Sequence, residues 1–115
     1  MIVLSKSTIA GGKNNTTGVS STEKSFKTNT AGGHRSTIGG GDSNIASGFQ
    51  STVGGGKGNT ASDMNSTVGG GIYNSVDGRQ STIGGGSSNK VNASASTIGG
   101  GRGNIVSDDH STIGG

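Results

Sequence analysis

Apolar and polar positions recur along this chain every fifteen residues. The tripeptide Ser-Thr-Ile or Ser-Thr-Val begins at six evenly spaced positions: Ser36, Ser51, Ser66, Ser81, Ser96 and Ser111. In Ser51-Thr52-Val53 the alternation puts serine and valine on one face and threonine on the other, which is typical of a half-buried strand. The segment Asn59-Thr60-Ala61-Ser62 alternates in the same way. A strict period this short predicts one structural unit stacked on copies of itself.

Two strands and two turns in each repeat predict an all-β fold, a flattened parallel β-solenoid or β-roll with fifteen-residue coils. The apolar position of the first strand is always Ile or Val, and that of the second strand is Ala or Val. β-Branched residues suit a pleated, stacked surface. Between the strands, one variable column is expected to face solvent or a partner: Phe49, Met64, Arg79, Ser94 and Asp109.

One turn position is usually glycine, and this predicts a backbone with positive φ there. The column reads Gly18, Gly33, Gly48, Asp63, Gly78, Ala93 and Asp108. Asp tolerates left-handed angles, whereas Ala93 fits them less well.

Two polar columns are candidate functional positions. The first is an asparagine ladder: Asn14, Asn29, Asn44, Asn59, Asn74, Asn89 and Asn104. Alternation points these side chains inward, so we expect them to hydrogen-bond between coils, the alternative being an outward polar stripe for ligands. The second column is a candidate exposed binding ladder: Thr37, Thr52, Thr67, Thr82, Thr97 and Thr112.

The repeats divide the chain into irregular N-terminal coils or a cap (1–28) and regular coils (29–115). Ser7-Thr8-Ile9 is one residue out of phase, and the coil expected at Ser21-Thr22 carries Glu23 where Ile belongs. Terminal repeats are often atypical because they cap the stack.

Composition changes the picture in one respect, because it makes the core thin. Only 24% of the residues are hydrophobic, and 26 of the 115 are glycine, so a globular core is excluded. The net charge of +3 and the absence of proline do not fit the usual disordered composition. A thin core favours a homo-oligomer that buries one flat face, and complementary charged ends also allow end-to-end assembly.

Chemistry-bearing motifs are not found, so we expect no catalytic residue, cofactor or metal. Asp108-Asp109-His110-Ser111 contains the residue types of a triad, but neighbours on a strand point to opposite faces. His34 and His110 lie five coils apart, about 24 Å at the usual strand spacing. Basic residues do not share a column and stacking aromatics are scarce, which argues against nucleic-acid binding. Neither a signal peptide nor a membrane-inserted segment is evident.

The unit running from Asn44 to Gly56, NIASGFQSTVGGG, resembles the head repeats of trimeric autotransporter adhesins, the YadA-like or haemagglutinin-like repeats, and related phage or viral fibre repeats. The resemblance covers residues 29–115 well and 7–28 loosely. It implies a left-handed β-roll, a homotrimer, an extracellular or phage and virus fibre location, and adhesion to a host or matrix receptor. The chain departs from that family in having no coiled-coil stalk or anchor barrel and a slightly longer period.

These observations predict a non-enzymatic structural or adhesive module, a fibre or adhesin head that presents a repetitive surface. One alternative is a subunit of a self-assembling filament. A second follows from Asn74-Ser75-Val76-Asp77-Gly78, which resembles the half-repeat of grass ice-recrystallisation inhibitors. That resemblance makes the threonine ladder a candidate ice-binding face.

Overall fold

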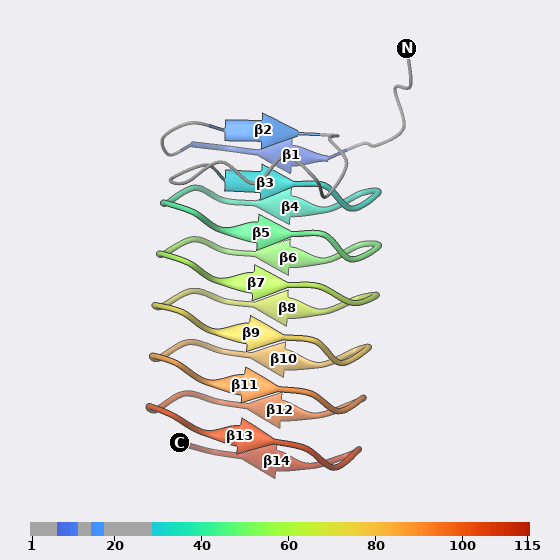
Figure 1. Ribbon diagram of the computed structural model, residues 1–115, viewed down its shortest axis with the longest axis vertical. Helices are drawn as coiled ribbons and strands as arrows, with labels where there is room; N and C mark the ends of the chain where they lie inside the picture. Colours follow the sequence, from blue (N-terminus) through green and yellow to red (C-terminus); the bar gives the residue numbers. More distant parts are fainter. Residues whose placement is uncertain (1–6, 12–14, 18–28) are drawn as a thin grey trace.

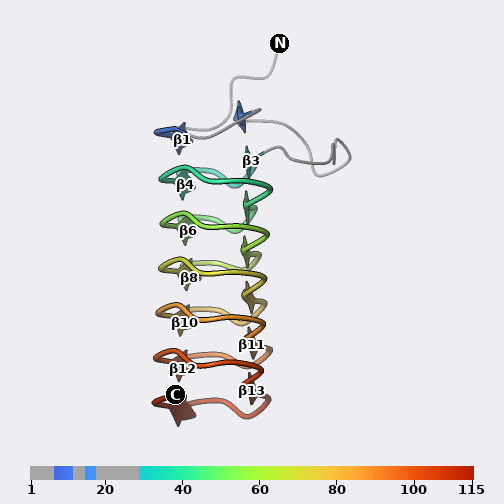
Figure 2. The ribbon, with the colours of Figure 1, turned by 90° about the vertical axis from the view of Figure 1, so that its left-hand side faces the viewer.

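The computed structural model describes residues 7–11, 15–17 and 29–115, and these residues form two parallel sheets wound into one rod (Figure 1). We name the first sheet the threonine sheet; in spatial order it contains β1 (Thr8–Ile9), β4 (Thr37–Ile38), β6 (Thr52–Val53), β8 (Thr67–Val68), β10 (Thr82–Ile83), β12 (Thr97–Ile98) and β14 (Thr112–Ile113). The second, the asparagine sheet, contains β2 (Asn15–Thr17), β3 (Asn29–Ala31), β5 (Ile45–Ala46), β7 (Thr60–Ala61), β9 (Ser75–Val76), β11 (Lys90–Val91) and β13 (Ile105–Val106). Figure 2 shows the two sheets as separate columns of strands that the chain visits alternately.

Equivalent residues of successive coils lie directly over one another. Thr82 pairs with Thr67 on one side and Thr97 on the other, and Val91 pairs with Val76 and Val106. All strand pairs are parallel, with a fifteen-residue offset in the regular coils. The prediction of a parallel β-solenoid with two strands per fifteen-residue coil is confirmed.

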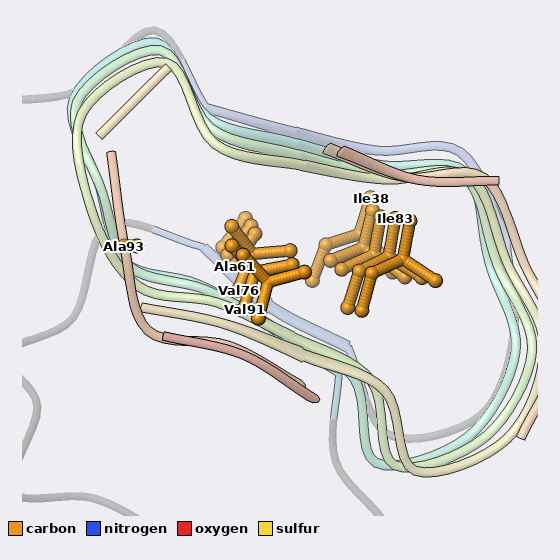
Figure 3. Packing of buried hydrophobic residues seen from close by; sticks show 12 residues of the cluster. Ile38, Ala61, Val76, Ile83, Val91 and Ala93 are labelled. Carbon is orange, nitrogen blue, oxygen red and sulfur yellow. The ribbon is translucent and has the colours of Figure 1, made fainter. Parts of the chain in front are cut away.

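The core is a narrow double column of side chains between the sheets. Figure 3 shows Ile38 and Ile83 entering from the threonine sheet, opposite Ala61, Val76 and Val91 from the asparagine sheet. All five are fully buried. Each regular coil supplies one Ile or Val and one Ala or Val, because only every second residue of a strand faces inward.

Two edges join the sheets. The glycine edge is formed by the residues between a strand of the threonine sheet and the next strand of the asparagine sheet. The short edge is formed by the residues between a strand of the asparagine sheet and the next strand of the threonine sheet. In the regular coils, the residue before each inward asparagine from Asn44 on and the residue before each inward serine have positive φ. Examples are Tyr73 (φ 56°) before Asn74 on the glycine edge and Gln80 (φ 55°) before Ser81 on the short edge. These angles turn the chain into each new strand.

The expectation of positive φ in the column of Gly33, Gly48 and Gly78 is wrong, because none of these three has positive φ. Glycine is favoured there by the closeness of the next coil. A Cβ built on Gly48 would lie 2.0 Å from the carbonyl oxygen of Asp63. Ala93, in the same column, has no positive φ either.

The first coils differ from the expected order. β1 pairs directly with β4, Thr8 opposite Thr37, and β2 pairs directly with β3. The place beside β4 that was expected for the coil at Ser21-Thr22 is therefore taken by β1, whose Ile9 packs against the core. Glu23 would put a carboxylate at that partly buried position against the core, where an unpaired charge is unfavourable. Residues 21–23 themselves lie outside the described residues.

Candidate functional surface

The asparagine ladder lies inside the rod. Asn29, Asn44, Asn59 and Asn74 are fully buried. Asn59 Nδ2 donates to the carbonyl oxygens of Gly55 and Gly71, both at 2.8 Å, and its Oδ1 accepts from the backbone N–H of Asn74 at 3.0 Å. Each asparagine therefore satisfies backbone groups of its own coil and the next one. This arrangement makes the column a set of internal hydrogen bonds and leaves no outward polar stripe.

The third glycine of each Gly-Gly-Gly segment belongs to the same arrangement. Gly56 has φ +88°, and a Cβ there would lie 2.1 Å from the carbonyl oxygen of Gly71 and 2.7 Å from Asn59 Nδ2. Both the backbone angle and the space require glycine. Only without a side chain can the glycine edge approach the asparagine amide this closely.

At the N-terminal end of the rod the strand register is shifted by one residue from the fifteen-residue period. The strand register places Asn15 opposite Asn29. Asn14, which the fifteen-residue period assigned to the ladder, lies outside the described residues. At the other end Asn104 is partly exposed and keeps its bond to Gly100, with Nδ2 to carbonyl oxygen 3.0 Å.

A second buried polar ladder is made of the repeat serines. Ser81 Oγ donates to the carbonyl oxygen of Ala93 at 2.7 Å and accepts from the N–H of Ser96 at 3.0 Å. Ser111 N–H bonds Ser96 Oγ in the same way, so Ser111 belongs to this ladder. Ser51 Oγ is the exception: among the described buried side chains it has no hydrogen-bond partner.

The threonine ladder lies on the outer face of the threonine sheet. Thr37, Thr97 and Thr112 are exposed, and Thr52, Thr67 and Thr82 are partly exposed. The register of β1 adds Thr8 above Thr37. The adjacent outer column is glycine, and a Cβ on Gly69 would lie 2.4 Å from the carbonyl oxygen of Gly84. This face therefore stays flat, with threonine hydroxyls and methyls spaced by about 4.8 Å along the rod.

We expect Thr67→Val to leave the free energy of unfolding within about 0.5 kcal/mol of wild type, since the site is on the surface and valine is also β-branched. Thermal unfolding followed by circular dichroism measures this. A loss of several kcal/mol would show that the threonine hydroxyls hold the fold together and are not an available surface.

Large apolar side chains are exposed at the edges and on the asparagine sheet. They are Phe49, Met64, Ile72, Tyr73 and Ile105. On the short edge the rings of His34 and Phe49 stack with centroids 5.6 Å apart, and Arg79 Nη2 lies 3.5 Å from Met64 Sδ. The variable column that was expected to face solvent or a partner does face outward at Phe49, Met64, Arg79 and Asp109, while Ser94 is partly exposed.

Apart from Asp42 on the glycine edge, the described acidic and imidazole groups lie along the short edge. Asp109 Oδ1 accepts from the backbone N–H of Ser94 at 2.7 Å, so that carboxylate bonds the preceding coil. Within the described residues, no three His, Asp or Glu side chains come close enough to hold a metal ion. The same residues include no helix of the length and apolarity needed to cross a membrane.

With this geometry in view, comparison with known proteins adds no family. No protein-family model and no curated protein matches the chain. What the chain can do must therefore be argued from its own surfaces.

Three features were missed by sequence reasoning: the hydrogen bonds of the serine ladder, the positive φ angles in the three columns that contain Gly56, Tyr73 and Gln80, and the exposed side chains of Ile72 and Tyr73 on the glycine edge. The serines were visible as an inward column, so their role could have been found by the argument used for asparagine. The column of Arg35, Gln50, Asn65, Gln80, Ala95 and His110 contains no glycine, and its positive φ angles had no sequence signal.

Proposed function

We propose that this chain is a non-enzymatic structural module, a segment of an extracellular fibre or of an adhesin head. One observation carries the proposal: every outward column is in register along the rod, while the interior is filled by apolar, asparagine and serine side chains. The threonine face is therefore offered repeatedly along a body of 41 × 22 × 21 Å, while the other outward columns vary from coil to coil. Such a body is suited to bind extended partners through repeated weak contacts.

Association into a homotrimer is part of this proposal. The supporting feature is the outer face of the asparagine sheet, where Ile45 is half-buried and Ile105 is 61% exposed at equivalent positions four coils apart. Thr60, Ser75 and Lys90, whose charge is paired with Asp77, lie between them. A core of two small apolar side chains per coil gives one chain little hydrophobic stabilisation. Covering the isoleucines with neighbouring chains would add to this hydrophobic stabilisation. Left-handed winding is the expectation that accompanies the trimer.

Analytical ultracentrifugation tests the oligomer. Wild type is expected to sediment at three times the mass of one chain, and Ile105→Lys is expected to shift the population to monomer by placing charges in the contact. Thr97→Lys changes another exposed residue, on the opposite sheet; it is the matched control and is expected to remain trimeric. A stable folded monomer for wild type removes the trimer from the proposal.

The flat threonine face supports a second candidate function, the binding of ice. The supporting observation is the unbroken in-register column of threonines beside a column of glycines. Ice crystals grown in a droplet of the protein are expected to be faceted if this face binds them. Rounded crystals at all protein concentrations would end this candidate without affecting the first.

A further inference from the structure

Tyr73 places a large exposed ring at a turn where the fold requires only the backbone angle, which Ser43 and Ser88 also adopt (φ 58° at each). Its φ is 56°, a left-handed angle that bulky side chains rarely adopt, and its side chain is 59% exposed. The equivalent residues of the two preceding and two following coils are Ser43, Gly58, Ser88 and Gly103. Glycine or serine thus makes the same turn without an exposed ring.

The tyrosine ring is held in place by the coil before it. A Cβ on Gly58 would lie 2.5 Å from Tyr73 Cδ1 and 2.6 Å from Cε1, so the ring packs directly on the glycine backbone. The Tyr73 N–H also donates to the carbonyl oxygen of Lys57 at 2.8 Å. Since the side chain is more than half exposed, the ring has one supported side and one open side. It is already positioned before any ligand binds.

Other groups follow the same edge in single file. Backbone bridges connect one residue per coil, in the order Asp42, Lys57, Ile72, Ser87 and Arg102. Lys57 and Arg102 are exposed, and three coil steps separate them, about 14 Å at the usual strand spacing. In the described part of the chain the ion pair joins Lys90 and Asp77, so Lys57 and Arg102 are both available to a ligand. Asp42, one coil before Lys57, ends the row with a carboxylate that accepts from Ser43 Oγ at 2.7 Å.

We infer that this edge binds a linear anionic polysaccharide lying along the rod. We name it the polysaccharide track, formed by Lys57, Ile72, Tyr73, Ser87, Ser88 and Arg102. A sugar ring has an apolar C–H face for the tyrosine, hydroxyls for the serines, and carboxylate or sulfate groups for the two cations. The inference deepens the adhesive role proposed above and rests on it, by naming the class of ligand.

Nucleic acid is the competing linear polyanion, and the track fits it less well. Single-stranded nucleic acid is bound by a continuous basic groove with several aromatic rings for successive bases. This track has one aromatic ring and two cations, with neutral residues between them. A polymer that is partly apolar and less densely charged suits this composition better.

The test is biolayer interferometry of the full chain against immobilised decasaccharides, one sulfated and one made of uronic acids, with neutral dextran and a single-stranded DNA decamer as controls. Wild type is expected to bind at least one anionic decasaccharide, more weakly as salt rises. The two anionic probes distinguish sulfate from carboxylate. No binding to either, or DNA binding as tight as the best polysaccharide, would overturn the inference.

Tyr73→Gly separates binding from folding. Because glycine occupies this position in two other coils, the variant is expected to keep or raise the melting temperature and to lose at least tenfold in affinity. Lys57→Gln and Arg102→Gln are each expected to weaken binding several-fold, and Arg79→Gln on the short edge to leave it unchanged. Tyr73→Gly binding as tightly as wild type would contradict the assignment.

Sedimentation of the same samples distinguishes the two proposals. A trimer that binds no anionic polysaccharide overturns the track alone. A monomer that binds one overturns the trimer alone.

Discussion

Replacing Gly71 with alanine is expected to destabilise the rod strongly. Gly71 has φ +91°, and a Cβ there would lie 2.1 Å from the carbonyl oxygen of Gly86 and 2.7 Å from Asn74 Nδ2. The strained angle and the overlap each cost on the order of 1–3 kcal/mol. We therefore expect Gly71→Ala to lower the melting temperature by at least about 8 °C in a thermal unfolding experiment.

The neighbouring glycine is the matched control. Gly70 has no atom within 4 Å of a built Cβ, and its φ is not positive. Gly70→Ala is expected to be neutral or to stabilise by up to about 1 kcal/mol, since alanine restricts the unfolded chain. Equal melting temperatures for Gly71→Ala and Gly70→Ala would refute the close contact between successive coils.

Removing one internal asparagine is expected to have the second large effect. In Asn59→Ala the carbonyl oxygen of Gly55 and the N–H of Asn74 lose the partner that the structure gives them, while the Gly71 oxygen keeps a bond from the N–H of Lys57 at 3.0 Å. Each buried group left unsatisfied costs about 1–3 kcal/mol. Chemical denaturation should therefore show a loss of several kcal/mol.

Two further variants make the asparagine test specific. Asn59→Asp keeps an acceptor for Asn74 but cannot donate to the Gly55 and Gly71 oxygens and buries a charge, so it is expected to be at least as destabilising. Asn92→Ala changes an exposed asparagine and is the control, expected to stay within about 0.5 kcal/mol of wild type. If Asn59→Ala unfolds at the same denaturant concentration as Asn92→Ala, the ladder does not stabilise the fold.

Much of the fold could be predicted from the period of the sequence. In each fifteen-residue repeat, the positions of Val53 and Ala61 are the inward-facing apolar positions of two alternating segments. Few arrangements other than stacked coils bury both of these side chains in every repeat. The inward direction of Asn59 followed from the same alternation. Local pattern was sufficient wherever the repeat was strict.

The remaining features depend on contacts between coils, which the pattern of one coil does not show. Gly48 was read as a turn glycine, yet its small size matters because the Asp63 carbonyl lies beside it. The direct pairing of Thr8 with Thr37 required knowing which segment fills the core next to β4. The polysaccharide track was missed because Lys57 and Tyr73 come together only when neighbouring coils stack.

The most direct test of the stacked coils is to measure two distances between spin labels. The chain has no cysteine of its own, so one pair of labels is attached through Thr37→Cys with Thr97→Cys and the other through Thr52→Cys with Thr112→Cys. The two residues of each pair lie four coils apart on the threonine ladder. Double electron–electron resonance, with labelled chains diluted in unlabelled ones, is therefore expected to give narrow distance distributions near 19 Å plus the reach of the labels. A flexible, glycine-rich segment of the same length would instead give a broad distribution centred at roughly 40–45 Å. A broad distribution, or two pairs with clearly different distances, would contradict the in-register stacking of the coils.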